Sequence, residues 1–143
     1  MNNIFNNKFL CVPFCVWLAI QIMKFITDWI VNKKPNFKRL VGAGGMPSSH
    51  SAVVATLTTL IGQEYGVESG IFAMSCVFSA IVMYDAAGVR RAAGKQATLL
   101  NKLVENATNS GIVVSEKLVE VLGHTPLQVI VGATIGICVG LLA

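Results

Sequence analysis

The sequence predicts an all-α protein, a polytopic membrane helix bundle of about four transmembrane helices with a cytoplasmic amphipathic helical hairpin. Of the 143 residues, 54% are hydrophobic and 13% are charged, which is about half the charge of an ordinary soluble domain. The apolar runs 70–84 and 126–143 have no charged residue on any helical face, unlike the helices of a soluble bundle. The basic residues gather on one side of the apolar runs. Together these observations favour a membrane protein over a very apolar soluble bundle.

The same composition limits the classes of protein to consider. At this length one domain is expected, a membrane-embedded unit over residues 1–143. So little charge excludes a disordered chain and a nucleic-acid module built on a broad charged face, and no nucleic acid is expected as a partner. The net charge of +4 instead fits anionic lipid head groups or phosphate. The four cysteines lie in apolar runs and are expected to behave as small hydrophobic residues.

The first predicted span is 9–31. It lacks a small-x-small cleavage site and continues through Gln21 and Lys24, so we expect a membrane helix rather than a signal peptide. Gln21 and Lys24 are three residues apart and share a helical face. Lys24 could reach a site near the helix end, or its side chain could simply extend to the membrane interface.

The second predicted span, 48–64, follows a Gly-Gly-Met-Pro turn, and its first helical turn contains Ser48, Ser49 and His50. Free backbone N–H groups and the positive end of the helix dipole make such a turn an anion site, and hydroxyls add donors. The alternative is an ordinary serine N-cap with an incidental histidine.

The third predicted span, 69–87, is followed by Arg90 and Arg91. Guanidinium groups suit phosphate, although paired arginines at a membrane boundary also fit the general preference of basic residues for the cytoplasmic side. Asp85 lies near the end of this span, where an unpaired carboxylate is costly, so it is expected to pair with one of these arginines.

The segment 92–122 differs in kind from the predicted spans. Its apolar residues fall at helical spacing in two sets, which a polar Asn-Ser-Gly break separates. It is expected to form two amphipathic helices on the cytoplasmic face. They would serve either as a packing hairpin or as a binding device.

The last predicted span, 125–143, begins directly after His124 and contains three glycines spaced four residues apart. Small residues at that spacing let membrane helices approach closely. The partner helix could belong to the same chain or to a second copy in a homo-oligomer. The glycines are Gly132, Gly136 and Gly140.

Charge placement predicts the orientation of the chain in the cell membrane. Four basic residues lie within 32–39 and five more within 90–117, whereas the opposite side receives Lys8 and two glutamates. Because basic residues favour the cytoplasm, the N-terminus is expected outside. Two histidines and several cations then share one depth at the cytoplasmic face, which predicts a phosphate site there. These residues are His50, His124, Arg39, Arg90 and Arg91.

Three segments in this order closely resemble the divergent branch of the type 2 phosphatidic acid phosphatase (PAP2) superfamily, which is related to the vanadium haloperoxidases. They are GGMPSSHSA, FAMSCVFSAIVMYDAAGVRRAAGKQA and LGHTPLQVIVG. The resemblance covers nearly the whole chain from Gln21 onward. It implies that His124 attacks phosphorus to form a phosphohistidine, and that His50 protonates the leaving alcohol. It implies no metal and no cofactor.

The resemblance also implies a clamp that holds the phosphoryl oxygens through hydroxyls, cations and backbone N–H groups. The family's first motif, Lys-x6-Arg-Pro, is absent in that form, and a lysine and an arginine elsewhere are its replacements. The clamp residues are Ser48, Ser49, Arg90 or Arg91, and the replacements are Lys24 and Arg39.

Two further departures from the superfamily pattern bear on activity. Leu118 stands where the third motif has an arginine, for which Arg90 or Arg91 could substitute. Gln128 stands where an acid orients the histidine. Its carbonyl can accept the imidazole N–H but cannot stabilise an imidazolium by charge, and in a serine protease triad the loss of that charge costs about 10⁴ in rate. Asp85 could supply a charge instead.

The sequence therefore predicts an integral membrane phosphatase for a lipid of the phosphatidic acid or phosphatidylglycerophosphate type, with a phosphohistidine intermediate. The alternative is a catalytically weakened or inactive membrane protein that binds phospholipid head groups, which Gln128 and Leu118 favour. A small transporter is disfavoured because no charged residue lies midway along the second, third or fourth span.

Overall fold

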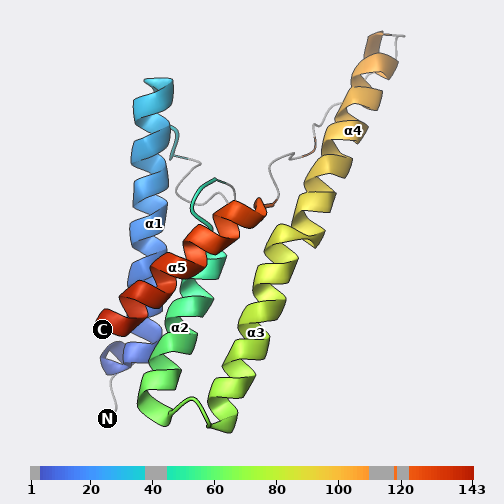
Figure 1. Cartoon of the computed structure of the whole chain (residues 1–143). Coiled ribbons are helices and arrows are strands. Elements are labelled where there is room, and N and C mark those ends of the chain that lie inside the picture. The colour runs from blue at the N-terminus through green and yellow to red at the C-terminus, as the bar shows by residue number, and fades with distance from the viewer. Residues whose placement is uncertain (1–3, 38–44, 110–117, 119–122) are drawn as a thin grey trace.

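The computed structural model describes residues 4–37, 45–109, 118 and 123–143. A short 3-10 helix, η1 (Ile4–Asn6), precedes five α-helices, and these described residues contain no strand. The predicted all-α class is therefore confirmed. The helices are α1 (Lys8–Asn32), α2 (Ser49–Tyr65), α3 (Gly70–Ala87), α4 (Val89–Asn109) and α5 (Pro126–Leu142) (Figure 1).

Helix α2 is the centre of the bundle, and α1, α3 and α5 pack around it (Figure 1). Many of its buried residues are small or carry a hydroxyl, among them Ser51, Ala52 and Thr56. The Thr56 hydroxyl lies 2.8 Å from the carbonyl oxygen of Ala52 and 3.1 Å from that of Gly136. The interior hydroxyls thus find backbone partners within the protein, as a water-poor environment requires.

Glycines of α5 form its contact with α2. Gly132, Gly136 and Gly140 are all buried. A Cβ atom at Gly132 would collide with the carbonyl oxygen of Ser48, and one at Gly136 would collide with that of Ala52. The structure thus shows these glycines in use for packing within the chain, against α2.

The bundle has polar side chains inside and large apolar side chains outside. Serine, threonine, lysine and histidine side chains are buried between the helices, whereas large hydrophobic side chains of α1, α3 and α5 are exposed. A soluble bundle has the reverse arrangement, and this one suits a lipid environment. Exposed examples are Phe14, Leu18, Phe78, Ile81 and Ile130.

Two stretches are long and apolar enough to cross a bilayer, namely α1 and the helical run Gly70–Asn106. Helix α5 is apolar but shorter, and α2 has 17 residues, whereas a perpendicular crossing takes about 20. By length and composition, two of the four predicted transmembrane spans qualify as membrane crossings, and the four-span topology stays a prediction. As helices, the four elements begin and end within one residue of the predicted spans. Those spans are 9–31, 48–64, 69–87 and 125–143.

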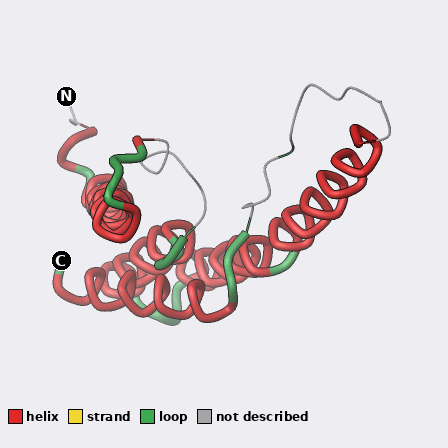
Figure 2. The backbone as a smooth tube through the Cα atoms, turned by 90° about the horizontal axis from the view of Figure 1, so that it is seen from above, coloured by secondary structure: helices red, strands yellow, loops and turns green. Residues whose placement is uncertain are grey.

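Helix α4 starts earlier than the predicted insert, 92–122. It begins at Val89 because helical hydrogen bonds continue through Gly88. The N–H of Gly88 donates to the carbonyl of Tyr84, and the N–H of Ala92 donates to the carbonyl of Gly88. The path from α3 into α4 is thus nearly continuous, and α4 extends away from the other helices (Figure 2).

The second half of the predicted hairpin lies at 110–117 and 119–122, outside the described residues. Leu118 is described, and it lies beside α4. Its N–H donates to the side-chain oxygen of Asn101 at 2.9 Å, and its carbonyl accepts from the Asn101 amide at 2.8 Å.

Candidate active site

Two backbone hydrogen bonds bring His50 and His124 together from distant parts of the sequence. The N–H of Ser48, the N-cap of α2, donates to the carbonyl of Gln128 in the first turn of α5 (3.0 Å). The N–H of His124 donates to the carbonyl of Ala86 at the end of α3 (2.9 Å). The imidazole centroids of the two histidines are 6.0 Å apart, and their planes are inclined by 59°.

Gln128 determines which nitrogen of His124 carries the proton. Its Oε1 accepts the N–H of Thr125 at 2.9 Å, and the Thr125 hydroxyl accepts the N–H of Gln128 at 3.3 Å, which closes a capping box. Because a backbone N–H can only donate, the atom facing it is the amide oxygen. The same oxygen lies 3.3 Å from Nδ1 of His124. Nδ1 therefore carries the proton of the neutral ring, and Nε2 keeps its lone pair.

Nε2 of His124 is a buried polar atom without a partner. The residue is only 1% exposed, and among the described residues no group meets hydrogen-bond geometry with this nitrogen, although the Gly45 carbonyl lies near the ring. Nδ1 of His50 is also buried and unpartnered among those residues. Because native proteins pair nearly all buried polar atoms, such atoms require an explanation, and a reacting group or ligand is one.

The surroundings of His124 keep its ring neutral. Burial is the main cause, and it lowers the pKa of His124 below the ordinary value of 6.5. The hydrogen bond to Gln128 raises the pKa in part, while the charge of Lys24 lowers it further. The ring is therefore uncharged at pH 7, which is the protonation state that a nucleophile needs.

Lys24 reaches the site from α1. The residue is 5% exposed, and its Nζ lies 3.5 Å from Oγ of Ser49. Gln21 is buried one turn earlier on the same helix. The charge of Lys24 acts on both histidines. The positive charge of Lys24 favours an anionic ligand in this site.

The two serines at the start of α2 are buried and differ in their contacts. The Ser48 hydroxyl accepts the N–H and the hydroxyl of Ser51, at 3.3 and 3.0 Å. Ser48 therefore caps α2, which agrees with the serine N-cap that was one of the two alternatives for this motif. Ser49 faces Lys24 instead. The structure thus brings Lys24, Ser49, His50, His124 and Gln128 together, with Ser48 supporting them.

Arg90 lies at the edge of the site. Its Nε donates to Oδ2 of Asp85 at 2.6 Å, which confirms that Asp85 pairs with an arginine. The charges of both side chains act on His50. The Arg91 side chain is exposed, and its backbone lies against Gly123, where a Cβ atom would collide with it. The remaining predicted cation, Arg39, lies outside the described residues.

A polar cavity of about 330 Å³ adjoins Lys24 between the second half of α1 and the turn that precedes α2. The carbonyl of Gly45 in its wall is close enough to act on His124. The site therefore has adjoining space for a polar head group. The lining residues are Lys24, Thr27, Asp28, Val31, Asn32, Gly45 and Met46.

Sequence reasoning missed two contributors to the site. Thr125 forms the capping box that orients Gln128, and its Thr-x-x-Gln pattern could have been recognised in the sequence. The carbonyl of Gly45 also acts on His124. No pattern signals that contact, because a backbone carbonyl contributes through position alone.

Comparison with known proteins shows what the chain is similar to. The sequence profile described as the divergent PAP2 family matches residues 5–139. An uncharacterized membrane protein of Bacillus subtilis (strain 168), YuiD, is 42% identical over 128 residues, which cover 82% of this chain and 81% of the relative. No solved structure matches.

Proposed function

The chain belongs to the divergent PAP2 family, and on that basis we propose that it is an integral membrane lipid phosphate phosphatase. Its substrate is a phosphomonoester of the phosphatidic acid or phosphatidylglycerophosphate type, and its site faces the cytoplasm at the cell membrane. One observation carries the proposal. Gln128 fixes the proton of His124 on Nδ1, and the lone pair on the buried Nε2 has no partner in the described structure.

The first step is transfer of the phosphoryl group to His124. Nε2 attacks phosphorus, an N–P bond forms, and the P–O bond to the lipid alcohol breaks. His50, which takes up a proton when the phosphate anion lies beside it, donates that proton to the alcohol oxygen as it leaves. The separation of 6.0 Å between the ring centroids lets both histidines contact one phosphoryl group.

The second step is hydrolysis of the phosphohistidine. A water oxygen attacks phosphorus, the N–P bond breaks, and the now neutral His50 accepts the proton of the water. His124 returns to its neutral form with the proton on Nδ1, and His50 regains the proton that it gave to the alcohol. Inorganic phosphate and the lipid alcohol are the products.

The charge that develops on the phosphoryl oxygens is stabilised by groups fixed before the reaction. The ammonium of Lys24 and the hydroxyl of Ser49 lie 3.5 Å apart in the buried site. The free N–H groups and dipole at the start of α2 add further positive potential. Groups that need no rearrangement during the reaction contribute most to such stabilisation.

A second candidate function is binding of phospholipid head groups without turnover. Gln128 favours it because a neutral amide cannot stabilise an imidazolium by charge. The ion pair of Arg90 with Asp85 at 2.6 Å favours it too, because a guanidinium held by a carboxylate is less available to phosphate. Both features weaken catalysis while the anion site persists.

Phosphate release by the purified chain tests the proposal. With phosphatidic acid or phosphatidylglycerophosphate in mixed micelles, we expect release of inorganic phosphate and an acid-labile phosphoryl group on His124. His124→Ala should abolish both. Undiminished release by that variant would refute the role of His124, and saturable lipid binding without release would select the second function.

Two lysine variants provide a matched comparison. Lys24→Met removes a buried charge at the site, whereas Lys102→Met removes an exposed charge from α4. We expect kcat/KM to fall about a hundredfold or more in the first, the usual effect of losing one group that stabilises a transition state. The second variant should retain the wild-type value.

A further inference from the structure

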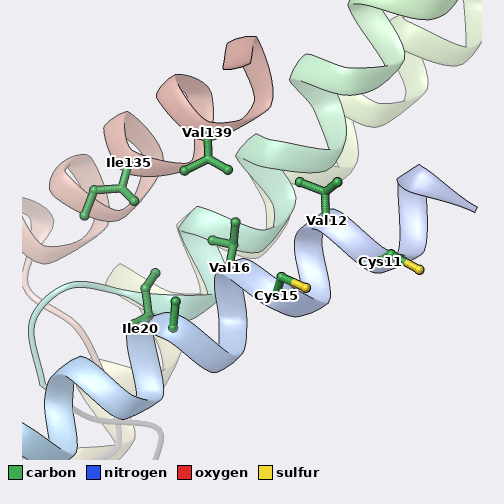
Figure 3. A pocket seen from close by; sticks show the side chains of 8 residues that line it. Cys11, Val12, Cys15, Val16, Ile20, Ile135 and Val139 are labelled. Atoms are coloured by element: carbon green, nitrogen blue, oxygen red, sulfur yellow. The ribbon is translucent and has the colours of Figure 1, made fainter. Parts of the chain in front are cut away.

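An apolar groove lies between α1 and α5, with a volume of about 380 Å³. Figure 3 shows its walls, where Cys15, Val16 and Ile20 of α1 lie across from Ile135 and Val139 of α5. All of its lining side chains are aliphatic or carry a thiol. Such a groove suits a hydrocarbon chain rather than a polar ligand.

The groove ends where the histidine site begins. Ile20 lines the groove and is 3% exposed, and Lys24 follows one helical turn later with 5% exposure. The polar cavity beside Lys24 continues along the same helix. Helix α1 therefore carries an apolar groove and then a polar cavity, the order of the tail and head of a lipid.

The length of the groove matches one leaflet of a bilayer. Its α1 residues run from Cys11 to Ile20, which is about 14 Å of helix at a rise of about 1.5 Å per residue. Half of a hydrocarbon core is about 15 Å. A lipid in the leaflet next to the site could therefore lay one chain along the whole groove while its phosphate reaches the histidines.

A second apolar cavity, of about 480 Å³, lies among α2, α3 and α5, with Phe72 and Cys76 in its lining. None of its lining residues belongs to α1, the helix that carries Lys24. Continuity with the polar site thus distinguishes the two cavities, and the second one serves as an internal control.

We infer that the groove between α1 and α5 binds an acyl chain of the lipid whose phosphate reaches His124. This inference rests on the proposed function and adds a chain-binding site to it. The site makes the protein selective for long-chain lipid phosphates. The groove acts by packing the acyl chain closely against aliphatic side chains, since a chain in the bilayer is already out of water.

Two tryptophan variants test where the chain binds. Cys15→Trp fills the α1–α5 groove, and Cys76→Trp fills the second cavity. The kinetic constants are measured for dioleoyl and dihexanoyl phosphatidic acid in mixed micelles. Cys15→Trp should reduce the preference for the dioleoyl lipid about tenfold, because the chain loses its packing contacts in the groove. Its kcat for the dihexanoyl lipid should not change, and Cys76→Trp should keep the wild-type preference.

Alkylation of native cysteines tests the same inference without hydrolysis. In the His124→Ala variant, dioleoyl phosphatidic acid should slow the reaction of Cys15 with N-ethylmaleimide about tenfold, as occupancy of about nine-tenths of the sites requires. Dihexanoyl phosphatidic acid and dioleoyl phosphatidylcholine should not slow it. Cys138 is exposed like Cys15 but lies outside the groove, so its rate should stay constant and serve as the control.

The outcomes separate this inference from the proposed function. Protection of Cys15 without phosphate release from the wild-type chain supports the groove and refutes the phosphatase. Equal protection by dioleoyl phosphatidylcholine overturns the inference, because the groove would then hold any lipid. A loss of chain-length preference in Cys76→Trp, or its retention in folded Cys15→Trp, overturns it as well.

Discussion

One oxygen of Gln128 serves two purposes at the start of α5. It accepts the N–H of Thr125 at 2.9 Å to close the capping box, and it lies 3.3 Å from Nδ1 of His124. The helix cap thus fixes the amide, and the amide then fixes the imidazole. Since the cap depends on the backbone of α5, His124, the proposed nucleophile, is oriented by the same contacts that begin the helix.

Substitution at Gln128 can separate orientation from charge. Glutamate keeps the capping box and adds a negative charge that raises the pKa of His124 and stabilises its phosphorylated, cationic form. We expect Gln128→Glu to raise the rate of phosphate release about tenfold, which corresponds to about one unit of pKa. Gln128→Leu should lower the rate at least about a hundredfold because the ring loses its position.

Thermal unfolding provides the control for these variants. Gln128→Leu keeps the Thr125 cap and loses only the bond from the Thr125 N–H to the side chain. That loss should cost about 1 kcal/mol, which leaves most of the chain folded when the assay is run. A rate for Gln128→Leu equal to that of the wild type would contradict the orienting role.

The pH dependence of phosphoenzyme formation follows from the lowered pKa of His124. The neutral ring is the reactive form, and the pKa lies below 6.5 mainly because the ring is buried. An aryl phosphate, whose leaving group needs no proton, isolates this step. Its burst rate should fall as the ring takes up a proton, with the half-maximal rate at a pH below 6.5. A midpoint at or above pH 6.5 would contradict this assignment.

Several residues of the site could be predicted from short motifs because those motifs also begin helices. Ser48, Ser49 and His50 start α2, and His124 precedes the capping box of α5. Which of Arg90 and Arg91 pairs with Asp85 at the edge of the site could not be predicted. It depends on the direction that each side chain takes beside Gly88, where α3 passes into α4.

At the scale of elements, the approach of α5 to α2 positions the two histidines. The bond from Ser48 to Gln128 crosses this interface, and Gly132 lies one turn further along α5 against the carbonyl of Ser48. The helices can approach this closely only because residue 132 has no side chain. A Cβ atom there would collide with the backbone at the start of α2.

Alanine substitution at the glycine interface should therefore separate α5 from α2. Gly132→Ala is expected to destabilise the chain by about 1–3 kcal/mol, the usual cost of overpacking, and to lower activity by moving His124 away from His50. Gly70→Ala is the matched control, since a Cβ there has no atom within 4 Å. The measurement is thermal unfolding in detergent, and equal midpoints for the two variants would contradict the close contact.

The helix bounds were predictable because each apolar run begins at a polar cap. Ser48, Ser69 and Thr125 all accept a backbone N–H in the first turn of their helices. The start of α4 was not predictable in the same way. Only Gly88 separates α3 from α4, and it lets the helical path continue where the composition changes from apolar to amphipathic.

At the scale of the whole molecule, the two ends of the bundle differ in their polar groups. One end holds the buried side chains of Lys24 and His124 and the half-buried side chain of His50. The opposite end holds an exposed ion pair, in which Nζ of Lys8 lies 2.6 Å from Oε2 of Glu64. Figure 1 shows these ends at opposite extremes of α2. A water-poor middle with two polar ends is the arrangement that a bilayer imposes.

Cysteine labelling of whole cells can determine which end faces the cytoplasm. Lys34 follows α1 at the site end, and Glu68 lies in the turn between α2 and α3 at the other end. Both residues are exposed. In a chain whose native cysteines are replaced by alanine, Glu68→Cys should react with an impermeant maleimide in intact cells. Lys34→Cys should react only after permeabilisation, because its basic loop is expected inside.

Each pattern of labelling has one interpretation. The reverse pattern would put the histidine site outside the cell and contradict a cytoplasmic substrate pool. Labelling of both cysteines from the same side would show that α2 does not cross the bilayer, since the two positions lie beyond opposite ends of α2.

The expected pattern would instead make α2, a helix of 17 residues, a crossing shorter than the usual span of about 20. The membrane around it would then be thinned, or the site end of α2 would lie in a protein-lined cavity at the interface. A buried lysine and two histidines at that end favour the cavity, because polar groups at membrane depth persist where protein or water surrounds them.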